Sequence, residues 1–476
     1  MRSYSRLIVS AVAAAMIAGS GSAQIRGGGG PIGGVLGGLG GLGGGLGGTV
    51  GGAVGQVGGA VGGTVGGVLG STGLGSTGTA PGAFNNGLLG NNFITGPVDL
   101  NRVSPLYDVS NASPAEIENY RLARLRALIN ANRSVLDGDP SGQPVRKREL
   151  IATNPDPVSL SLAVRAGFRV IGDEQEGDLG IRLVTLGIPK GMNVRKALQA
   201  VRRAAPALQC DYNHVFEPSG GGLWPVAGFA MAASAPVPGA IRIAMIDGGV
   251  AAHPSLARAS IEQRGFAGDP QPTGHGTAVG SLLVGDQGPF RGAARGAQLF
   301  VGDVYGGNPA AGSVTSIVRA LSWAASKRPS VVNISLVGPN NASLARAIAA
   351  LQAQGIQVVA AVGNDGPAAP VQYPASYPGV IAVTGVDAKD RALSEAGKAA
   401  HLDFAAPGAD MAAAFPGRGY VIVRGTSFAS PLAAARLAIT GSYQRLALEA
   451  RPGRGKVGRG IVCVTCRTDP KVVRAN

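Results

Sequence analysis

Apolar and polar residues follow one pattern up to about residue 218 and a different one after about residue 240. After residue 240, short runs that are apolar throughout alternate with amphipathic segments. We expect strands over residues 241–247, 298–304, 330–336, 358–363 and 380–386, a helix from His275, and helices over residues 313–325 and 343–354. Uniformly apolar strands separated by helices are typical of a parallel sheet that is covered on both faces. The pattern therefore predicts an α/β domain with a doubly wound, mainly parallel sheet over residues 241–442.

The segment before residue 219 has a different order of elements. Strand patterns cover residues 149–153, 168–172, 179–187 and 208–216, and helix patterns cover residues 157–166 and 193–204. This β-α-β-β-α-β order predicts a small α+β, ferredoxin-like domain over residues 146–218. A further helix over residues 114–132, with Ser113 as its N-cap, is expected inside a helical segment that covers residues 97–145.

The first residues resemble an export signal. Arg2 and Arg6 precede an apolar run over residues 7–18, and small residues lead up to Ala23. We predict a signal peptide over residues 1–23, cleavage after Ala23, and a product that is secreted to the extracellular space, the periplasm or the cell envelope. No later segment offers about 18 uninterrupted apolar residues, so no stable membrane span is expected.

Glycine dominates the next segment, residues 24–96, which repeats units such as GGTV and GGAV almost without charge. Glycine loses the most backbone entropy on ordering, and these repeats carry little side-chain surface to offset that loss. We expect a disordered, low-complexity linker. Association of this segment with itself or with an envelope surface is the alternative.

Positive charge is concentrated at the other end of the chain. The net charge is +15, and residues 443–476 hold 8 basic and 2 acidic residues, an excess of 6. We expect a basic, solvated or anion-seeking C-terminal tail, and this distribution does not indicate a nucleic-acid binder. Cys463 and Cys466 form a C-x-x-C pair in this tail, for which a disulfide, a redox pair, free thiols and half of a zinc site are the alternatives. Zinc needs two further ligands and the tail has no histidine, and Cys210 has no obvious partner.

Three segments interrupt the apolar background of the larger domain. IAMIDGGV ends a strand at Asp247, GHGTAVG places His275 at a helix start, and GTSFASP places Ser427 at another. A hydroxyl is a weak nucleophile until a base takes its proton, and the base needs a carboxylate that orients it. The order Asp, His, Ser argues against a lipase-type hydrolase, as does Ala429 at the place of the second glycine in Gly-x-Ser-x-Gly.

At these residues the sequence resembles the subtilisin-like serine proteases, the subtilases, over about residues 240–440. The resemblance implies a catalytic triad of Asp247, His275 and Ser427. A fourth matching segment, AAVGNDGP, puts Asn364 where the family keeps the asparagine of its oxyanion hole, with the backbone N–H of Ser427 as second donor.

The resemblance also implies substrate-binding residues. VVNISLVGP is similar to the edge of the family's substrate cleft, which would bind an extended peptide through Ser335, Leu336, Val337 and Gly338. Subtilases more often have glycine where Val337 stands, so a tighter cleft is expected. QYPASYPGVIAV resembles the base of the primary pocket and puts Gln372 near its floor, so neutral, medium-sized side chains are expected there.

Subtilases are commonly made with an inhibitory chaperone domain whose last strand enters the cleft. The resemblance therefore implies that residues 146–218 are such a prodomain, and that self-cleavage falls within the linker over residues 219–240, before Pro238. Gly248 stands where the family usually has serine or threonine, which removes a hydroxyl that would hold the carboxylate. The segment GDQGPFRGAARG lacks the family's longer calcium-binding loop, so we expect no calcium there and no metal or cofactor.

Two classes of function remain open. The first is a secreted serine endopeptidase, made as an autoprocessed zymogen, that acts on polypeptides and is a monomer. The second is a catalytically degenerate surface or matrix protein that acts through its Gly-rich and basic ends. Degenerate subtilases usually lose a triad residue, and none is missing here. Among the other polar residues, His253 and His401 are expected at the surface, His214 in a structural place, and Asp303 at a strand end where it could line the cleft.

Overall fold

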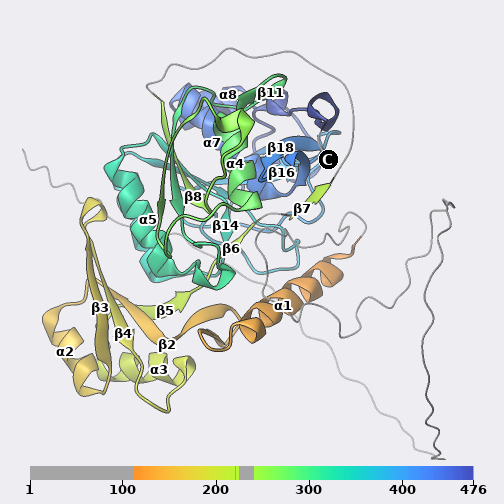
Figure 1. Cartoon of the computed structure of the whole chain (residues 1–476). Helices are drawn as coiled ribbons and strands as arrows, with labels where there is room; N and C mark the ends of the chain where they lie inside the picture. Colours follow the sequence, from red (N-terminus) through yellow and green to blue (C-terminus); the bar gives the residue numbers. More distant parts are fainter. Residues whose placement is uncertain (1–111, 220, 225–240, 475–476) are drawn as a thin grey trace, which may run out of the picture. The chain divides into compact units, whose positions relative to one another are not determined.

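The computed structural model describes residues 112–219, 221–224 and 241–474, and all of these belong to one structural unit (Figure 1). For brevity, residues 112–219 are called the N-terminal domain and residues 241–474 the C-terminal domain. The expected signal peptide, the Gly-rich segment and most of the expected processing linker lie outside these residues. Within the described ranges, no helix combines the length and the apolar character that a membrane crossing requires.

The N-terminal domain, residues 112–219, contains an antiparallel sheet and three helices. Its strands are β1 (Leu136–Gly138), β2 (Pro144–Thr153), β3 (Arg169–Glu176), β4 (Ile181–Gly187) and β5 (Cys210–His214), and its helices are α1 (Pro114–Ala131), α2 (Pro157–Arg165) and α3 (Val194–Ala204). Strand β2 pairs with β1, β4 and β5, and β4 pairs with β3, all antiparallel. This is the β-α-β-β-α-β arrangement that the sequence predicts, preceded by α1 and β1.

The two faces of this sheet are both covered, but by different partners. Leu150 and Leu186 point into a core that includes buried residues of α3. Ile151 and Leu183 point to the opposite face, where they join a core with residues of α5 (Val314–Ser326) and α6 (Ala342–Ala353) of the second domain. Successive side chains of a strand point to opposite faces, so one strand serves both cores.

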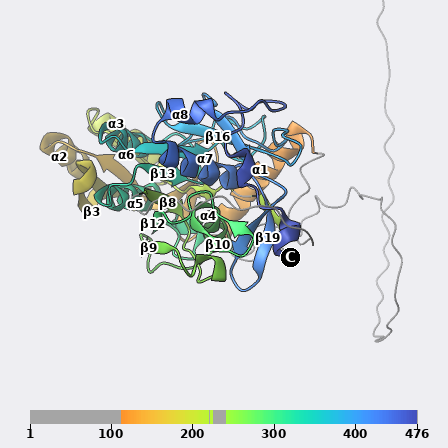
Figure 2. The same ribbon diagram turned by 90° about the horizontal axis from the view of Figure 1, so that it is seen from above.

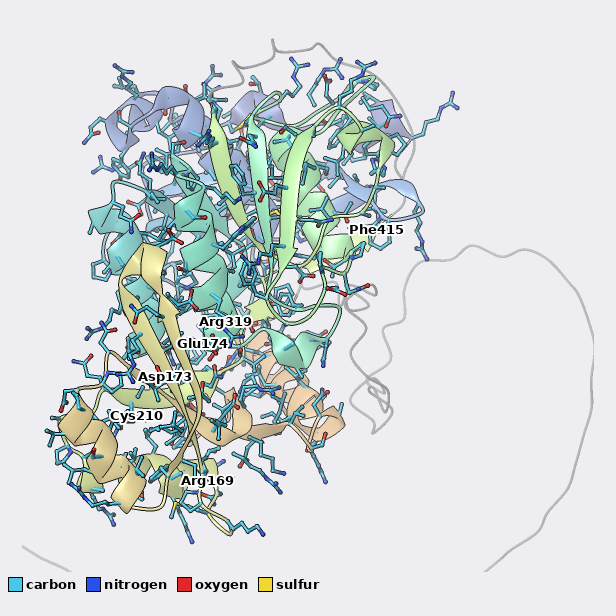
Figure 3. The ribbon with its side chains drawn as sticks, turned by 60° about the vertical axis from the view of Figure 1, so that its left-hand side comes forward. Arg169, Asp173, Glu174, Cys210, Arg319 and Phe415 are labelled. Atoms are coloured by element: carbon cyan, nitrogen blue, oxygen red, sulfur yellow. A yellow bond between two sulfur atoms is a disulfide. The ribbon has the colours of Figure 1, made fainter. Side chains whose placement is uncertain are left out.

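Polar contacts reinforce the junction of the two domains. The hydroxyls of Thr153 and Ser343 are 2.6 Å apart, and Glu174 forms an ion pair with Arg319 on α5 (Figure 3). Cys210, also labelled in Figure 3, is buried as a free thiol, and burial raises its pKa to about 12.

The C-terminal domain is built on a parallel sheet of seven strands in the order β17-β16-β15-β13-β8-β12-β9. Figure 2 shows β16, β13, β8, β12 and β9 in this sequence across the domain. The strands are β8 (Arg242–Asp247), β9 (Ser260–Gly265), β12 (Gln298–Asp303), β13 (Val331–Ile334), β15 (Gln357–Ala361), β16 (Ile381–Val386) and β17 (Phe404–Pro407). The predicted mainly parallel sheet is confirmed.

Helices cover both faces of this sheet. Residues of α4 (Gly274–Val284) and α7 (Thr426–Thr440) belong to the core on one face, and residues of α5 (Val314–Ser326) and α6 (Ala342–Ala353) to the core on the other. This is the doubly wound arrangement, in which sites form beyond the carboxyl ends of the strands.

Short strands outside the main sheet hold the segment that joins the two domains. Strand β6 (Glu217–Pro218) pairs with β14 (Leu336–Val337), and β7 (Gly221–Trp224) pairs with β19 (Gly419–Arg424), which forms a hairpin with β18 (Met411–Phe415). A second hairpin joins β10 (Asp286–Gln287) to β11 (Phe290–Arg291). Both pairings are antiparallel. Strand β6 ends just before Ser219, and β7 begins two residues after it, at Gly221.

The C-terminal segment differs from the solvated tail that its charge suggests. It continues through α8 (Tyr443–Leu448), and Val462 and Cys463 lie in the core around α7. Arg467 donates hydrogen bonds to the carbonyl oxygens of Ala409 and Asp387, at 2.8 and 2.7 Å. The expectation of a solvated extension is therefore wrong for residues 443–474, because a few apolar residues and Arg467 anchor the backbone while most of the basic side chains face solvent. Cys463 and Cys466 form a disulfide.

Candidate active site

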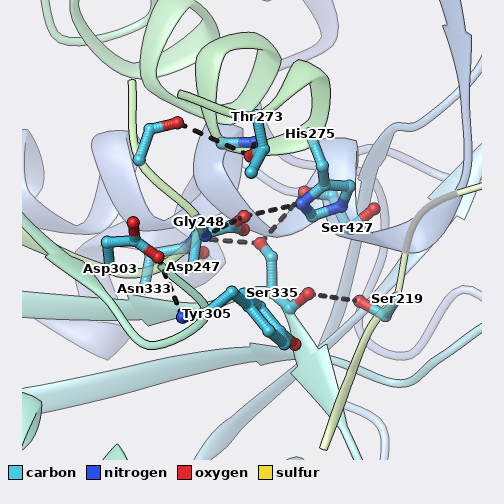
Figure 4. Close-up of polar contacts among 12 residues, drawn as sticks. Ser219, Asp247, Gly248, Thr273, His275, Asp303, Tyr305, Asn333, Ser335 and Ser427 are labelled. Atoms are coloured by element: carbon cyan, nitrogen blue, oxygen red, sulfur yellow. Dashed lines mark hydrogen bonds and ion pairs between the residues drawn. The ribbon is translucent and has the colours of Figure 1, made fainter. Parts of the chain in front are cut away.

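The carboxyl edge of the parallel sheet brings Asp247 and His275 together. Asp247 ends β8, His275 lies in the first turn of α4, and the Oδ1 atom of the carboxylate is 2.8 Å from Nδ1 of the imidazole (Figure 4). The backbone N–H of Gly248 donates to the same oxygen at 2.7 Å. Both side chains are buried, with exposed fractions of 0% and 4%. The carboxylate therefore fixes the orientation of the ring and leaves Nε2 as the other reactive nitrogen.

Ser427 lies at the start of α7, beside the imidazole (Figure 4). Gly425, at φ 144°, is the N-cap of this helix, a backbone conformation that favours glycine. Within the described residues, the Oγ atom of Ser427 and Nε2 of His275 are buried and have no hydrogen-bond partner. Buried polar atoms are almost always paired, so an unpaired hydroxyl beside an unpaired imidazole nitrogen indicates a reactive site.

Asn364 connects the nucleophile helix to the segment between the two domains. Its Oδ1 atom accepts a hydrogen bond from the backbone N–H of Thr426 at 2.9 Å, and its Nδ2 atom donates to the carbonyl oxygen of Ser219. One amide side chain is thus anchored at the helix start and contacts a peptide carbonyl with its donor group. This is the geometry by which an oxyanion hole holds the oxygen of an attacked carbonyl.

The predicted cleft edge holds the chain that leads to that carbonyl. Glu217 pairs with Val337 and Pro218 with Leu336. Ser219 donates to the carbonyl oxygen of Ser335 through its backbone N–H at 2.9 Å and through its hydroxyl at 3.0 Å. Main-chain pairing of this kind binds an extended peptide whatever its sequence.

Gly338 continues this edge and is bridged to Tyr373 by two backbone hydrogen bonds of 3.0 Å. A Cβ atom at position 338 would lie 2.7 Å from the ring of Phe216, so only glycine leaves room for that ring. The buried phenyl group precedes Glu217 in the bound segment, and it anchors that segment in the apolar core of the C-terminal domain.

Val337 and Gln372 both lie close to Gly363, the residue before Asn364. A Cβ atom built on Gly363, the residue before the asparagine, would lie 3.2 Å from Cγ1 of Val337 and 3.4 Å from Cγ of Gln372. Gln372 is buried, and its Nε2 atom donates to the carbonyl of Pro370 at 3.1 Å. The space next to the asparagine is therefore bounded by one apolar and one neutral polar side chain.

A buried hydrogen-bond network, which the sequence analysis did not predict, holds the backbone of Ser427. Nδ2 of Asn333 donates to the hydroxyl of Ser335 at 3.0 Å, and that hydroxyl donates to the carbonyl oxygen of Ser427 at 3.1 Å. The hydroxyl of Ser430 donates to Oδ1 of Asn333. All four residues are fully buried. The available signal was an asparagine inside the apolar strand VVNI, which needs partners when buried.

Glycines around His275 allow backbones to approach closely. A Cβ atom at Gly274 would lie 2.2 Å from the ring of Phe415, and one at Gly276 would lie 2.2 Å from the carbonyl oxygen of Gly248. A Cβ atom at Gly248 would lie 2.4 Å from the hydroxyl of Thr273, which caps α4 by accepting from the N–H of Gly276 at 2.9 Å. The hydroxyl missing at position 248 is thus matched by a threonine on the facing segment, and a backbone N–H holds Asp247.

Two further polar residues, Asp303 and His253, have structural contacts near the site or the β19 hairpin. Asp303 pairs in register with Asp247 on the neighbouring strand, but its carboxylate accepts backbone hydrogen bonds from Gln271, Tyr305 and Gly306. Burial raises the pKa of Asp303, and its role is to shape the loop before α4. His253 is buried, with its ring bonded to the carbonyl of Gly419 at 2.9 Å, so its expected surface position is wrong.

Comparison with known proteins agrees with this geometry. The model of the subtilase family matches residues 239–450. Over 209 residues the chain is 34% identical to subtilisin Savinase of Lederbergia lenta. The aligned region covers 42% of this chain and 75% of that protein. It is equally similar, at 34% over 209 residues, to the alkaline protease of Alkalihalobacillus alcalophilus, of which it spans 53%.

Among solved structures, the fold is similar to that of fervidolysin from Fervidobacterium pennivorans, described as a keratinolytic enzyme related to subtilisin. The TM-score is 0.57 at 18% identity, and the match covers 70% of this chain and 62% of that one. At this identity the likeness supports the fold alone.

Proposed function

Because this chain belongs to the subtilase family of serine endopeptidases, we propose that it hydrolyses peptide bonds with Ser427 as nucleophile, and that its first substrate is its own chain. The roles of the individual residues follow from the geometry of the site. His275 is the general base and acid, Asp247 orients and stabilises the imidazolium, and Asn364 and the backbone N–H of Ser427 bind the oxyanion.

One observation carries this proposal: the carbonyl oxygen of Ser219 accepts a hydrogen bond from Nδ2 of Asn364. A carbonyl bound by an oxyanion-hole donor is the one that the nucleophile attacks. We therefore assign the peptide bond between Ser219 and Gly220 as the bond that is cleaved, within the linker where the sequence predicts processing.

The reaction then proceeds in two steps. Oγ of Ser427 adds to the carbonyl carbon of Ser219 while Nε2 of His275 takes the hydroxyl proton. The C–N bond breaks, and His275 returns the proton to the amine of Gly220. A water molecule, deprotonated by His275, hydrolyses the acyl-enzyme and leaves a carboxylate on Ser219.

Strand pairing supports this assignment from both sides of the bond. Strand β6 pairs with β14 before Ser219, and β7 pairs with β19 after it. Strand pairing on both sides of the bond is the kind of positioning that accelerates an intramolecular attack. The side chain before the bond is the small hydroxyl of Ser219, and Val337 and Gln372 lie close to Gly363, next to the asparagine that contacts Ser219. We therefore propose that neutral residues are preferred before the cleaved bond, with the small side chain of Ser219 accepted beside the medium-sized side chains that the family resemblance implies.

The same contacts support a zymogen. Residues 112–219 would act as an inhibitory prodomain whose last strand fills the cleft, and the mature enzyme would act on polypeptides outside the cytoplasm, after export by residues 1–23. A monomer suffices for this mechanism, because all proposed groups come from one chain. The alternative is a degenerate scaffold, and the presence of Asp247, His275 and Ser427 in one buried site argues against it.

Expression of the full chain beside Ser427→Ala tests the proposal. We expect the wild type to be cleaved to a fragment that begins at Gly220 and to hydrolyse casein, while Ser427→Ala stays intact. N-terminal sequencing identifies the bond. Equal cleavage of both chains would exclude self-processing, and a different N-terminus would overturn the assignment of Ser219. A wild type that hydrolyses no peptide after its prodomain is removed would favour the scaffold.

A further inference from the structure

Helix α1 lies outside the β-α-β-β-α-β unit, and it contacts the turn that follows Asn364. The helix begins at a capping box, in which Ser113 and Glu116 exchange side-chain to backbone hydrogen bonds of 3.3 and 2.7 Å. Near that start, Ile117 is 2% exposed and lies against Gly366, where a Cβ atom would be 2.8 Å from Cγ2 of the isoleucine. Gly366 has a φ of 77°, so both its backbone and its surroundings require glycine.

About two helical turns further along, Arg124 connects the segment after Asn364 to the segment in the cleft. Its Nη2 atom is 3.0 Å from Oδ1 of Asp365 and 3.1 Å from Oε2 of Glu217, and its Nε atom is 3.3 Å from Oε1 of Glu217. The three side chains are 24%, 7% and 17% exposed. Burial alone would lower the pKa of Arg124, but the two carboxylates more than offset this and raise it.

The two carboxylates belong to different parts of the processed protein. Glu217 lies two residues before Ser219, on β6, and leaves with the N-terminal domain after cleavage. Asp365 stays in the C-terminal domain, next to Asn364. Without the guanidinium, two partly buried carboxylates would face each other across the junction, and their repulsion would favour separation.

We propose that α1 is an inhibitory latch, and that Arg124, by bridging Glu217 and Asp365, keeps the cleaved N-terminal domain bound over the active site. This inference rests on the proposed self-cleavage, because only then do the two carboxylates belong to separate chains. The apolar contact of Ile117 with Gly366 positions the helix, and the guanidinium of Arg124 forms ion pairs with both carboxylates. Cleavage and activation are then separate events, and the latch sets the delay between them.

Full-length Arg124→Met tests the latch, with Arg126→Met, an exposed residue of the same helix, as the matched control. In the wild type we expect the cut at Ser219 to precede peptidase activity by a measurable lag. Arg124→Met shortens that lag about 10-fold at an unchanged rate of cleavage, since loss of one member of a partly buried charge pair mainly speeds dissociation. Arg126→Met leaves the lag unchanged. An unchanged lag in Arg124→Met would overturn the latch.

A second measurement separates the latch from the proposed function. In the Ser427→Ala background the chain stays whole, and hydrogen exchange of the α1 backbone reports how firmly the helix is held. Adding Arg124→Met speeds exchange in α1 about 10-fold, and adding Arg126→Met does not. Equal exchange in both would overturn the latch even if self-cleavage is established. Faster exchange with Arg124→Met would support it even if the wild type is cut at another bond, which would refute only the proposed processing site.

Discussion

The N-terminal and C-terminal domains differ in whether their buried polar side-chain atoms have hydrogen-bond partners. Within residues 112–219, every fully buried side-chain nitrogen or oxygen has a hydrogen-bond partner. In the C-terminal domain, the Oδ2 atom of Asp247, Nε2 of His275 and Oγ of Ser427 are buried without partners among the described residues. Other buried atoms of this domain, such as Nη2 of Arg295 and Oγ1 of Thr315, also lack partners within the described ranges, but in the site an unpaired hydroxyl and an unpaired imidazole nitrogen lie side by side (Figure 4). The N-terminal domain therefore contributes packing against the C-terminal domain, and the C-terminal domain contributes the candidate catalytic groups.

The largest effect is expected where the two domains meet, at Asn364. Replacement by alanine removes the amide that donates to Ser219, and loss of one oxyanion-hole donor lowers kcat about 10²- to 10³-fold in subtilisin. We expect a decrease of this size in casein or peptide hydrolysis and in the rate of self-cleavage.

The exposed residue Asn340 provides a matched control, since its replacement by alanine removes the same kind of amide from a position outside the proposed oxyanion hole. Kinetics of both variants, with thermal unfolding to verify the fold, are the measurement. If Asn364→Ala retains full kcat, the amide contributes to structure only and the comparison between the domains fails.

A smaller effect is expected from Asn333, which contacts neither substrate nor triad side chains. Alanine at this position leaves the hydroxyls of Ser335 and Ser430 with fewer partners and releases the backbone of Ser427. Loss of buried hydrogen bonds costs about 1–3 kcal/mol, so we expect kcat to fall about 10-fold while KM changes little. Peptide kinetics with Asn333→Ala and the double variant with Ser335→Ala measure this. A change confined to thermal stability would make the network purely structural.

The smallest effect on activity is expected from Asp139, a paired group of the N-terminal domain. Its carboxylate contacts Nε2 of His214 at 3.3 Å. Burial alone would raise the pKa of Asp139, but the hydrogen bonds from His214 and the backbone of Gln143 hold it below its ordinary value. A lowered pKa means that the carboxylate stabilises the fold above pH 3.8 and that this contribution is lost as the pH falls further.

We therefore expect Asp139→Asn, in the uncleaved Ser427→Ala chain, to lower the free energy of unfolding by about 1 kcal/mol at pH 7 and by less at pH 3. Urea unfolding at the two pH values measures it. Hydrolysis by the processed enzyme is expected to be unchanged. A loss of activity in the processed enzyme would show that this domain contributes chemistry as well.

The sequence was informative wherever one short segment carries both the structure and the chemistry. Apolar runs predicted the central strands, and three motifs predicted residues that the fold brings to one edge of the sheet. Strand β9, SIEQRG, escaped prediction because it is a mostly exposed edge strand with polar residues on both faces. The Asn333 network escaped because its members are dispersed along the chain and meet only in the fold. The anchored C-terminal segment was misjudged because charge counts describe side chains, and here a few apolar residues and one arginine decide the course of the backbone.

The pairing of β6 with β14 and of β7 with β19 also has a kinetic consequence. Under the proposed self-cleavage, each molecule carries its own first substrate, so the encounter that limits ordinary proteolysis is absent. Maturation by this route is a first-order process whose half-time is the same in a dilute and in a crowded compartment. The rate constant for self-cleavage then does not depend on the concentration of the protein.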